Sequence, residues 1–411
     1  MGGVSMEWKL KDLTVDGKGS YGIGAPAVPY QEDKLTYLRI TDINNDGSLN
    51  FSDLKSVDAE DAEKYILKEN DIVFARTGNS TGRSYFYEKQ HGTFVYAGFL
   101  IKFSLDPNKV NPKILKYYTH SKPYFDWVNS FDTGATRGNI NAKTYGDMEI
   151  ELPSRKVQDK IVSILSSLDR KIELNNKINA DLEEMAQAIF KNWFVDFEPF
   201  KDGKFVDSEL GMIPEGWKVG RADDFYQINI GKTPPRKEHK WFSTNPADKI
   251  WVSIANMGNS GIFISDSSEY LTKEAVDRHN IIMVPRNTIL LSFKLTVGRV
   301  AIADKELTTN EAIARFILSD DKYMEYLYLY LKNFDYNSLG STSSIATAVN
   351  SKTIKGMQML QPSDKIIDAF HIQVNPIFEK IRSLTKENSR LSLLRDTLLP
   401  RLMSGELEVP E

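Results

Sequence analysis

Polar side chains gather in an eight-residue loop at positions 76–83, between two apolar runs. Arginines stand at both ends of the loop, and hydroxyls, an amide and two glycines lie between them. A guanidinium can donate two hydrogen bonds to a guanine edge or to a phosphate, and amides and hydroxyls suit adenine or phosphate oxygens. The same composition is typical of a solvated hairpin loop, so both interpretations stay open. The candidate DNA contacts here are Arg76, Thr77, Asn79, Ser80 and Arg83.

A second loop, rich in glycine and hydroxyls, occurs late in each half of the chain. Glycines allow the backbone to approach a ligand closely, and hydroxyls can satisfy phosphate oxygens. An Asn and a Lys follow each loop at the same spacing, and they suit either a nucleic-acid contact or a structural turn cap. The candidate residues of these two segments are Thr136, Arg137, Asn139, Asn141, Lys143, Ser341, Thr342, Ser343, Ser344, Asn350 and Lys352.

The net charge of −4 argues mildly against a nucleic-acid ligand. Phosphate binding needs a local basic surface, however, and not a basic average. Residues 6–153 carry 18 Lys and Arg against 21 Asp and Glu, about −3, whereas residues 217–362 carry 18 against 15, about +3. The candidates for a positive surface in the second half are Lys232, Arg236, Lys237, Lys294 and Arg299.

Motifs for catalysis or metal binding are incomplete in this sequence. The absence of cysteine excludes disulfides, thiolate zinc sites and thiol catalysis, and the five histidines are scattered. Gly231-Lys232-Thr233 resembles the end of a phosphate-binding loop, but Tyr226 stands where that loop needs a glycine. Asn111-Pro112-Lys113 and Asn245-Pro246-Ala247 lack the second proline of the motif with which amino-methyltransferases hold a flipped base. We therefore expect no catalytic residue, metal or cofactor in this chain.

Length and hydropathy limit the architecture and the location of the protein. The 411 residues exceed one typical core, so we expect two domains. No run of eighteen apolar residues is present, and Met1–Ser5 lack the charged and apolar regions of a signal peptide. We therefore expect a cytoplasmic protein without membrane contact. The second methionine, Met6, leaves open whether residues 1–5 are native.

The two halves of the chain repeat each other. Trp8-Lys9 recurs as Trp217-Lys218, and Gly22 recurs as Gly231, both at an offset of 209 residues. The offset widens in the middle of the repeat and returns to 209 where Asn141 matches Asn350. A constant offset at both ends, with small insertions between, indicates an internal duplication.

Each half ends in a proline that precedes a long helical pattern without glycine. Ser154 and Ser363 suit the N-cap position of these helices. In the first helix, apolar and small residues recur every 3.5 residues, which is the spacing of a coiled-coil seam. Asn175 and Asn179 stand at the two seam positions that lack an apolar residue, and the same seam recurs 209 residues later. Pro376 predicts a kink or a late start in the second helix.

Two such seams favour an antiparallel coiled coil about 50 Å long, in which Asn179 and Asn388 are polar seam residues. Ordinary amphipathic helices that pack on their own domains remain the alternative. The fold class that we predict is α+β, with two similar mixed α/β domains and two long antiparallel helices. The predicted segments are a domain at 1–153, a helix at 154–194, a linker at 195–216, a domain at 217–362 and a helix at 363–411.

Four aromatic residues at the start of the linker do not suit a flexible connection. They predict burial, either against the helices or against a partner protein. The candidate partner contacts are Trp193, Phe194, Phe197 and Phe200.

These segments resemble the specificity subunits of type I restriction-modification systems. The resemblance is carried by Lys171-Ile172-Glu173-Leu174-Asn175-Asn176-Lys177-Ile178-Asn179, by the run from Phe190 to Phe200, by Ile213-Pro214-Glu215-Gly216-Trp217-Lys218, and by Leu399-Pro400-Arg401-Leu402-Met403-Ser404-Gly405-Glu406-Leu407. It covers the whole chain in the order domain, helix, domain, helix.

The resemblance implies that each domain is a target recognition domain that reads one half of a bipartite, asymmetric site in double-stranded DNA. The paired helices would act as a ruler and as the dock for two adenine methyltransferase subunits, with restriction and translocase subunits in the full complex. S-adenosylmethionine, ATP and Mg would belong to those partners. The alternatives are a duplicated coiled-coil scaffold without DNA specificity and a fused methylase or nuclease.

Overall fold

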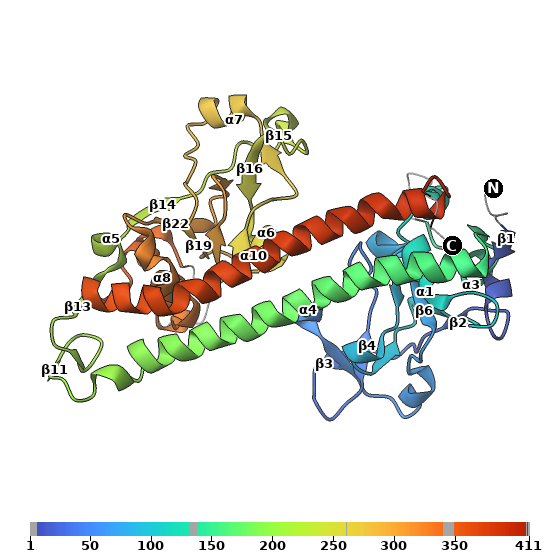
Figure 1. Cartoon of the computed structure of the whole chain (residues 1–411), viewed down its shortest axis with the longest axis horizontal. Helices are drawn as coiled ribbons and strands as arrows, with labels where there is room; N and C mark the ends of the chain where they lie inside the picture. Colours follow the sequence, from blue (N-terminus) through green and yellow to red (C-terminus); the bar gives the residue numbers. More distant parts are fainter. Residues whose placement is uncertain (1–5, 132–137, 260, 340–348, 408, 410–411) are drawn as a thin grey trace. The chain divides into compact units, whose positions relative to one another are not determined.

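A computed structural model describes residues 6–131, 138–259, 261–339, 349–407 and 409. The chain divides into two compact units: unit 1 comprises residues 1–172 and 390–411, and unit 2 comprises residues 173–389. Each unit combines small β-sheets and short helices with one end of each long helix, α4 (Arg155–Phe194) and α10 (Asp364–Met403) (Figure 1). The predicted α+β class is confirmed.

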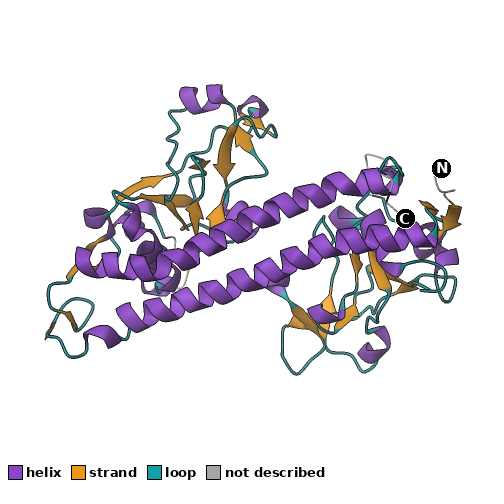
Figure 2. Cartoon of the chain, viewed as in Figure 1, coloured by secondary structure: helices purple, strands orange, loops and turns teal. Residues whose placement is uncertain are grey.

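Unit 1 is built on three small sheets, in the orders β2-β9-β6-β7, β3-β5-β4-β8 and β1-β10. Its strands are among those coloured orange in Figure 2. Strand β6 lies between β9 and β7, and all five of its residues are buried, as its nearly continuous apolar run predicts. The elements are β1 (Met6–Lys9), β2 (Ser20–Tyr21), β3 (Ala27–Pro29), β4 (Thr36–Leu38), β5 (Lys55–Val57), β6 (Asp71–Ala75), β7 (Ser84–Phe86), β8 (Phe94–Tyr96), β9 (Leu100–Ser104), α1 (Pro112–Tyr118), α2 (Lys122–Asn129), α3 (Ala142–Gly146) and β10 (Glu149–Leu152).

Unit 2 repeats this plan, with the orders β14-β22-β19-β20-β17, β15-β18-β16-β21 and β13-β23. A two-stranded sheet of β11 and β12 precedes them in the linker. The elements are β11 (Phe205–Val206), β12 (Ile213–Pro214), β13 (Lys218–Arg221), α5 (Ala222–Phe225), β14 (Gln227–Ile230), β15 (Phe242–Ser243), β16 (Lys249–Val252), α6 (Ile254–Asn259), β17 (Phe263–Ile264), β18 (Tyr270–Leu271), α7 (Lys273–Arg278), β19 (Ile289–Ser292), β20 (Val300–Ala303), β21 (Thr308–Thr309), β22 (Ile313–Ile317), α8 (Met324–Asn333), α9 (Ser351–Lys355) and β23 (Gln358–Gln361).

The matching strand orders confirm the internal duplication. Gly22 and Gly231, which match in the duplication, also occupy equally crowded places. A Cβ atom on Gly22 would lie 2.2 Å from the carbonyl oxygen of Tyr96, and a Cβ atom on Gly231 would lie 2.0 Å from that of Asn310. At both places the backbone passes so close to a neighbouring segment that only glycine fits.

The match between Trp8 and Trp217 is out of register in the structure. Trp8 pairs with Ile150 in the β1–β10 ladder, and the residue at the corresponding place of the β13–β23 ladder is Gly220, which pairs with Met359. Trp217 instead packs in the aromatic core of unit 2. The 209-residue spacing between the two tryptophans is therefore a coincidence, although β1 and β13 are equivalent strands.

The long helices run antiparallel, as predicted, and their pairing is visible inside unit 2. Asn175 of α4 donates a hydrogen bond to Asn388 of α10 at 2.8 Å, and further along α4 the ring of Phe190 lies 6.4 Å from that of Phe370. Asn388, one of the two predicted polar seam residues, thus has Asn175 as a partner across the helix pair. The buried Oδ1 of Asn179 has no hydrogen-bond partner among the described residues.

The helices also pack on the domains that precede them, so the two predicted arrangements coexist. Phe370, Val374 and Phe378 of α10 are fully buried in the main core of unit 2. The prediction that Pro376 delays the second helix is wrong, because α10 begins at Asp364, twelve residues earlier, and extends over 40 residues. At about 1.5 Å per residue each helix is about 60 Å long. No helix within the described residues is long and apolar enough to cross a membrane.

Candidate nucleic-acid interface

The two polar loops of unit 1 lie against each other. The carbonyl of Arg76 accepts a hydrogen bond from the Ile140 amide at 3.0 Å, and the Arg76 Nε donates to Asn139 Oδ1 at 3.3 Å. The Thr81 hydroxyl donates to the Gly138 carbonyl at 3.1 Å. Segments more than fifty residues apart in the sequence are thereby joined into one polar surface.

Arg76 is the centre of this surface. Its guanidinium lies 5.0 Å from the ring centre of Tyr21. Among the described residues its side-chain acceptor is the neutral amide of Asn139, which leaves its positive charge for a phosphate or a base edge. Asn79 and Asn139 are exposed beside it. We call Arg76, Asn79, Asn139 and Tyr21 the Arg76 surface. Tyr21 was not among the predicted site residues, and its only signal in the sequence is an aromatic residue before a glycine.

Other residues of the 76–83 loop are less accessible. Ser80 is buried, and Thr77 is half-buried. Arg83 donates from Nη1 to the carbonyl of Ile43 at 2.9 Å, and Arg299 of unit 2 donates from Nη1 to the carbonyl of Ile254 at 2.9 Å. These two arginines occupy matching places after β6 and β19. The geometry therefore gives Arg83 and Arg299 a structural role that holds a neighbouring loop.

The duplicated asparagines are helix caps. Asn141 accepts a hydrogen bond from the Thr144 amide at 2.9 Å at the start of α3, and Asn350 accepts from the Lys352 and Thr353 amides at 2.9 and 3.1 Å at the start of α9. The cap satisfies amides that the first helical turn leaves without partners. Lys143 and Lys352 are exposed just inside the two helices, so their charges lie at equivalent positions of the two units.

In unit 2, Arg236 in the basic segment after β14 lies on aromatic side chains. The guanidinium of Arg236 lies 4.2 Å from the ring centre of Phe242 and 4.5 Å from that of Trp251, and it forms an ion pair with Glu269 at 2.5 Å. Lys232 donates to the carbonyl of His279 at 2.5 Å. Stacking fixes the plane of a guanidinium, which favours directional contacts. Lys237 is exposed in the same loop.

The positive charges of Lys294 and Arg236 lower the pKa of one carboxylate, that of Glu311. Burial by itself would raise the pKa of Glu311, but a hydrogen bond from Thr233 and the positive charges of Lys294 and Arg236 hold the pKa below its ordinary value. Lys294 is exposed in the turn between β19 and β20, the turn that corresponds to the 76–83 loop. The basic residues of unit 2 therefore surround the ends of β14, β19 and β22. Thr136, Arg137, Ser341, Thr342, Ser343 and Ser344 lie outside the described residues.

The linker aromatics are covered by their own unit. Phe194 is 5% exposed, and its ring lies 4.8 Å from Phe370 and 5.7 Å from Trp217. Phe200 lies 5.1 Å from Trp217, and Trp193 and Phe197 are partly buried against the same core. Of the two predicted arrangements, burial against the helices is the one that the structure contains. These rings position the start of unit 2, and their contact with a partner protein stays a prediction.

Comparison with known proteins agrees with this architecture. The family model described as type I restriction modification DNA specificity domain matches residues 9–184 and 214–371. The type I restriction enzyme HindI specificity subunit of Haemophilus influenzae is 26% identical, with 91% of this chain and 94% of that protein covered. The MjaIX specificity subunit of Methanocaldococcus jannaschii is 31% identical, with 72% of this chain and 69% of that protein covered.

The fold has a counterpart among solved structures. The crystal structure of a type I restriction-modification system S subunit from M. genitalium aligns over 99% of this chain and 97% of that one, with a TM-score of 0.55 and 14% identity. The family match covers most of the sequence and both repeats. The chain therefore belongs to the DNA specificity subunits of type I restriction-modification systems, non-catalytic subunits with two target recognition domains.

Proposed function

We propose that each unit reads one half of a bipartite DNA site with the loops described above. In unit 1 the reader is the Arg76 surface together with Lys143. In unit 2 it comprises Lys232, Arg236, Lys237, Lys294 and Lys352. The observation that carries the proposal is the repeated topology, which presents polar loops at equivalent strand ends while their side chains differ.

The difference between the loops predicts an asymmetric site. The Arg76 surface combines a guanidinium with two amides, a set that suits purine edges. The loops of unit 2 are richer in lysine, which suits phosphate contacts, and the two domains differ by about six charges in the counts given above. Two readers with different side chains select two different half-sites.

The long helices are the proposed spacer and dock. Two antiparallel helices of 40 residues each suit a spacer that sets the distance between two half-sites. In this proposal two methyltransferase subunits bind the helices and restriction subunits complete the complex. S-adenosylmethionine, ATP and Mg are then bound by those partners.

Selection from random duplexes tests the proposal. The chain, assembled with its methyltransferase subunit, is incubated with a random DNA pool, and bound duplexes are sequenced. We expect two short blocks separated by an unspecified gap of fixed length. Enrichment of a single block, or no enrichment, would contradict the half-site reading.

A matched pair of deletions tests the spacer. Removal of one heptad from α4 and the facing heptad from α10 keeps the seam in phase, and we expect a shorter gap or loss of selection. A control that exchanges exposed helix residues without changing the length should retain the original gap. An unchanged gap after the double deletion would remove the ruler from the proposal.

A further inference from the structure

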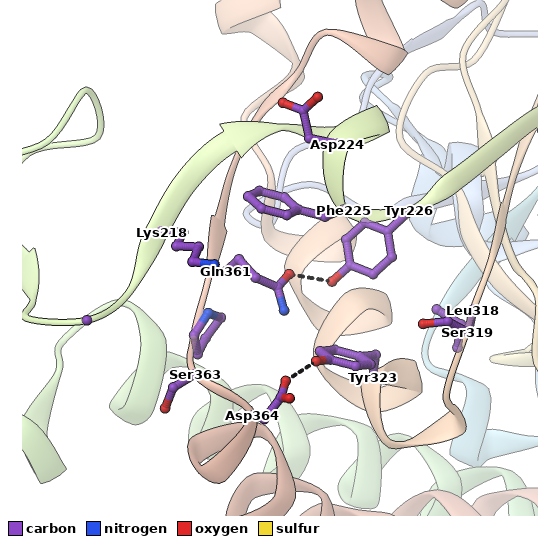
Figure 3. A pocket seen from close by; sticks show the side chains of 12 residues that line it. Lys218, Asp224, Phe225, Tyr226, Leu318, Ser319, Tyr323, Gln361, Ser363 and Asp364 are labelled. Atoms are coloured by element: carbon purple, nitrogen blue, oxygen red, sulfur yellow. Dashed lines mark hydrogen bonds between the residues drawn. The ribbon is translucent and has the colours of Figure 1, made fainter.

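Unit 2 carries a cavity of about 490 Å³ at the start of α10 and a leucine at the tip of a turn. In the cavity, Figure 3 shows the Tyr226 hydroxyl donating to Gln361. It also shows the Tyr323 hydroxyl donating to Asp364, so these polar side chains find their partners within the chain. Leu295, in contrast, is 99% exposed in the turn between β19 and β20.

The backbone of Leu295 has the left-handed conformation, with a φ of +60°. The Thr296 amide donates to the carbonyl of Lys294 at 2.6 Å, which closes a three-residue turn with the leucine at its centre. In this conformation a Cβ atom crowds the backbone, so any residue with a side chain is strained where glycine is not. Three-residue turns of this hand are rare for the same reason. The turn therefore holds a bulky residue where glycine would be more stable.

The first repeat has a glycine at the same position. Gly78 lies three residues after β6 and has a φ of +72°, and Leu295 lies three residues after β19, the equivalent strand. The first amide after each strand, that of Arg76 or Phe293, donates to the carbonyl that directly precedes β9 or β22, at 3.1 or 3.0 Å. The exposed leucine gains no burial that would offset its backbone strain. Strain of this kind favours a role outside the chain.

Contacts inside unit 2 fix the turn, and its surroundings are basic. Phe293 is buried before the turn, and the Ser292 hydroxyl donates to the Thr296 carbonyl at 2.6 Å. Lys294 is exposed directly beside the leucine. The carboxylate of Glu311 lies near Lys294, and a second cation from the loop after β14 also acts on it. A fixed apolar tip beside positive charge suits a ligand that combines phosphates with stacked apolar faces, as duplex DNA does.

We propose that Leu295 enters the base stack of the half-site that unit 2 reads and separates one base step, while Lys294 contacts a phosphate. The inference rests on the proposed function and adds an apolar contact to it. Leucine is among the side chains that proteins insert between base pairs, where the cost of unstacking is offset by the contacts that the distorted duplex allows. Gly78 has no side chain to insert, so the proposal assigns this unstacking to the half-site of unit 2.

Duplexes that carry 2-aminopurine test the insertion, because the fluorescence of this base analogue rises when it loses its stacked neighbours. The full chain, assembled with its methyltransferase subunit, is added to duplexes of the selected site with the analogue at successive positions of both blocks. We expect a rise at one step with the wild type and with Leu295→Met, which keeps an apolar side chain. The rise should be absent with Leu295→Gly and with Leu295→Asn, both of which tolerate a positive φ.

Two further measurements on Leu295→Gly separate recognition from folding. After the cost of unstacking is included, loss of the buried leucine should weaken specific binding about tenfold. The variant should nevertheless melt at or above the wild-type temperature, because glycine relieves the strain of the turn. A lower melting temperature would show that the leucine serves the fold and would overturn the argument from strain.

The outcomes also separate this inference from the proposed function. If the wild type selects two blocks but gives no fluorescence rise that depends on Leu295, the insertion is refuted and the half-site reading stands. If the wild type selects no block at all, both are refuted. Weaker assembly of Leu295→Gly with the methyltransferase subunit in the absence of DNA would assign the leucine to a protein contact and overturn the insertion.

Discussion

Asp169 gives the sharpest test of how α10 is held in unit 1. This carboxylate of α4 is 9% exposed and accepts a hydrogen bond from the Tyr117 hydroxyl at 2.9 Å. It also forms ion pairs with Lys116 at 3.2 Å and with Arg395 of α10 at 3.0 Å. The perturbation is Asp169→Asn, which keeps the shape of the side chain and removes its charge.

The expected loss of stability follows from these contacts. Breaking a buried ion pair by removing one partner costs about 3–5 kcal/mol. The lower end applies here, because Lys116 keeps Glu88 at 3.2 Å and Arg395 keeps Asp396 at 3.0 Å. We therefore expect a loss of about 3 kcal/mol in the free energy of unfolding of unit 1. For a unit of about 190 residues this lowers the Tm by about 6–12 °C.

The loss should depend on pH in a definite direction. Burial alone would raise the pKa of Asp169, but the charge of Lys116 and the hydrogen bonds from Arg395 and Tyr117 outweigh it and lower the pKa below its ordinary value. A carboxylate with a lowered folded pKa stabilises the protein above its unfolded pKa, near 4, and this stabilisation disappears as the pH falls through the folded pKa. The difference between the wild type and Asp169→Asn should be constant from pH 6 to 8 and shrink below about pH 4.

Thermal unfolding followed by circular dichroism measures both effects. Asp396→Asn is the matched control, because Asp396 pairs with the same arginine but its side chain is 62% exposed, and we expect a change of less than about 0.5 kcal/mol. If Asp169→Asn melts within 1 °C of the wild type at pH 7, the network does not hold α10. A difference that grows on acidification would refute the assigned sign of the pKa shift.

Three further changes separate recognition from structure. Arg76→Ala should weaken specific DNA binding of the assembled complex by about 1–3 kcal/mol and relax one half-site, measured by fluorescence anisotropy at fixed salt; an unchanged affinity and motif would exclude Arg76 as a reader. Asn350→Ala removes the cap of α9 and should cost about 1 kcal/mol in chemical denaturation, and a neutral effect would argue against the cap. Gly231→Ala should destabilise unit 2 by about 3 kcal/mol or more, whereas Gly24→Ala, whose Cβ would meet no atom within 4 Å, should melt like the wild type.

The duplication and the long helices could be predicted from sequence because both depend on local spacing. The constant offset located the caps Asn141 and Asn350, and the 3.5-residue repeat located α4. Spacing alone could not choose the partner of Asn388, because Asn175 and Asn179 both occupy skipped places of the seam. That choice depends on how the two helices are shifted along each other, which is set by the packing of side chains from both.

The candidate site was predictable only in part. The residues of the Arg76 surface come from separate loops, and their convergence depends on a backbone hydrogen bond between Ile140 and Arg76 that no local pattern predicts. The sequence predicts Arg83 and Arg299 as DNA contacts, because each follows a glycine in a polar loop. A guanidinium at such a place can donate either to a phosphate or to a backbone carbonyl. In the fold each arginine donates from Nη1 to a carbonyl, that of Ile43 or Ile254, which is a structural contact that the sequence did not predict, and their contact with DNA stays a prediction.

One buried position shows how the repeats diverged without losing their plan. Lys102 faces Val73 in the β6–β9 ladder and pairs with Asp71 at 3.4 Å. At the equivalent place of the β19–β22 ladder stands Arg315, opposite Leu290, and Thr288 replaces the aspartate.

Arg315 is 1% exposed, and burial lowers its pKa to about 10. Within the described residues its guanidinium donates to uncharged acceptors, the carbonyls of Ile282 and Ile230 at 2.7 and 2.8 Å and the Thr308 hydroxyl at 3.2 Å. Ile230 directly precedes the Gly231–Lys232 turn, so this arginine anchors the basic loop of unit 2, whereas Lys102 is neutralised inside its own sheet. The same sheet thus holds a half-buried lysine paired with a carboxylate in one repeat and a buried arginine with uncharged acceptors in the other. The arginine supports a basic loop after β14, whereas the matching loop of unit 1, residues 22–26, carries no cation.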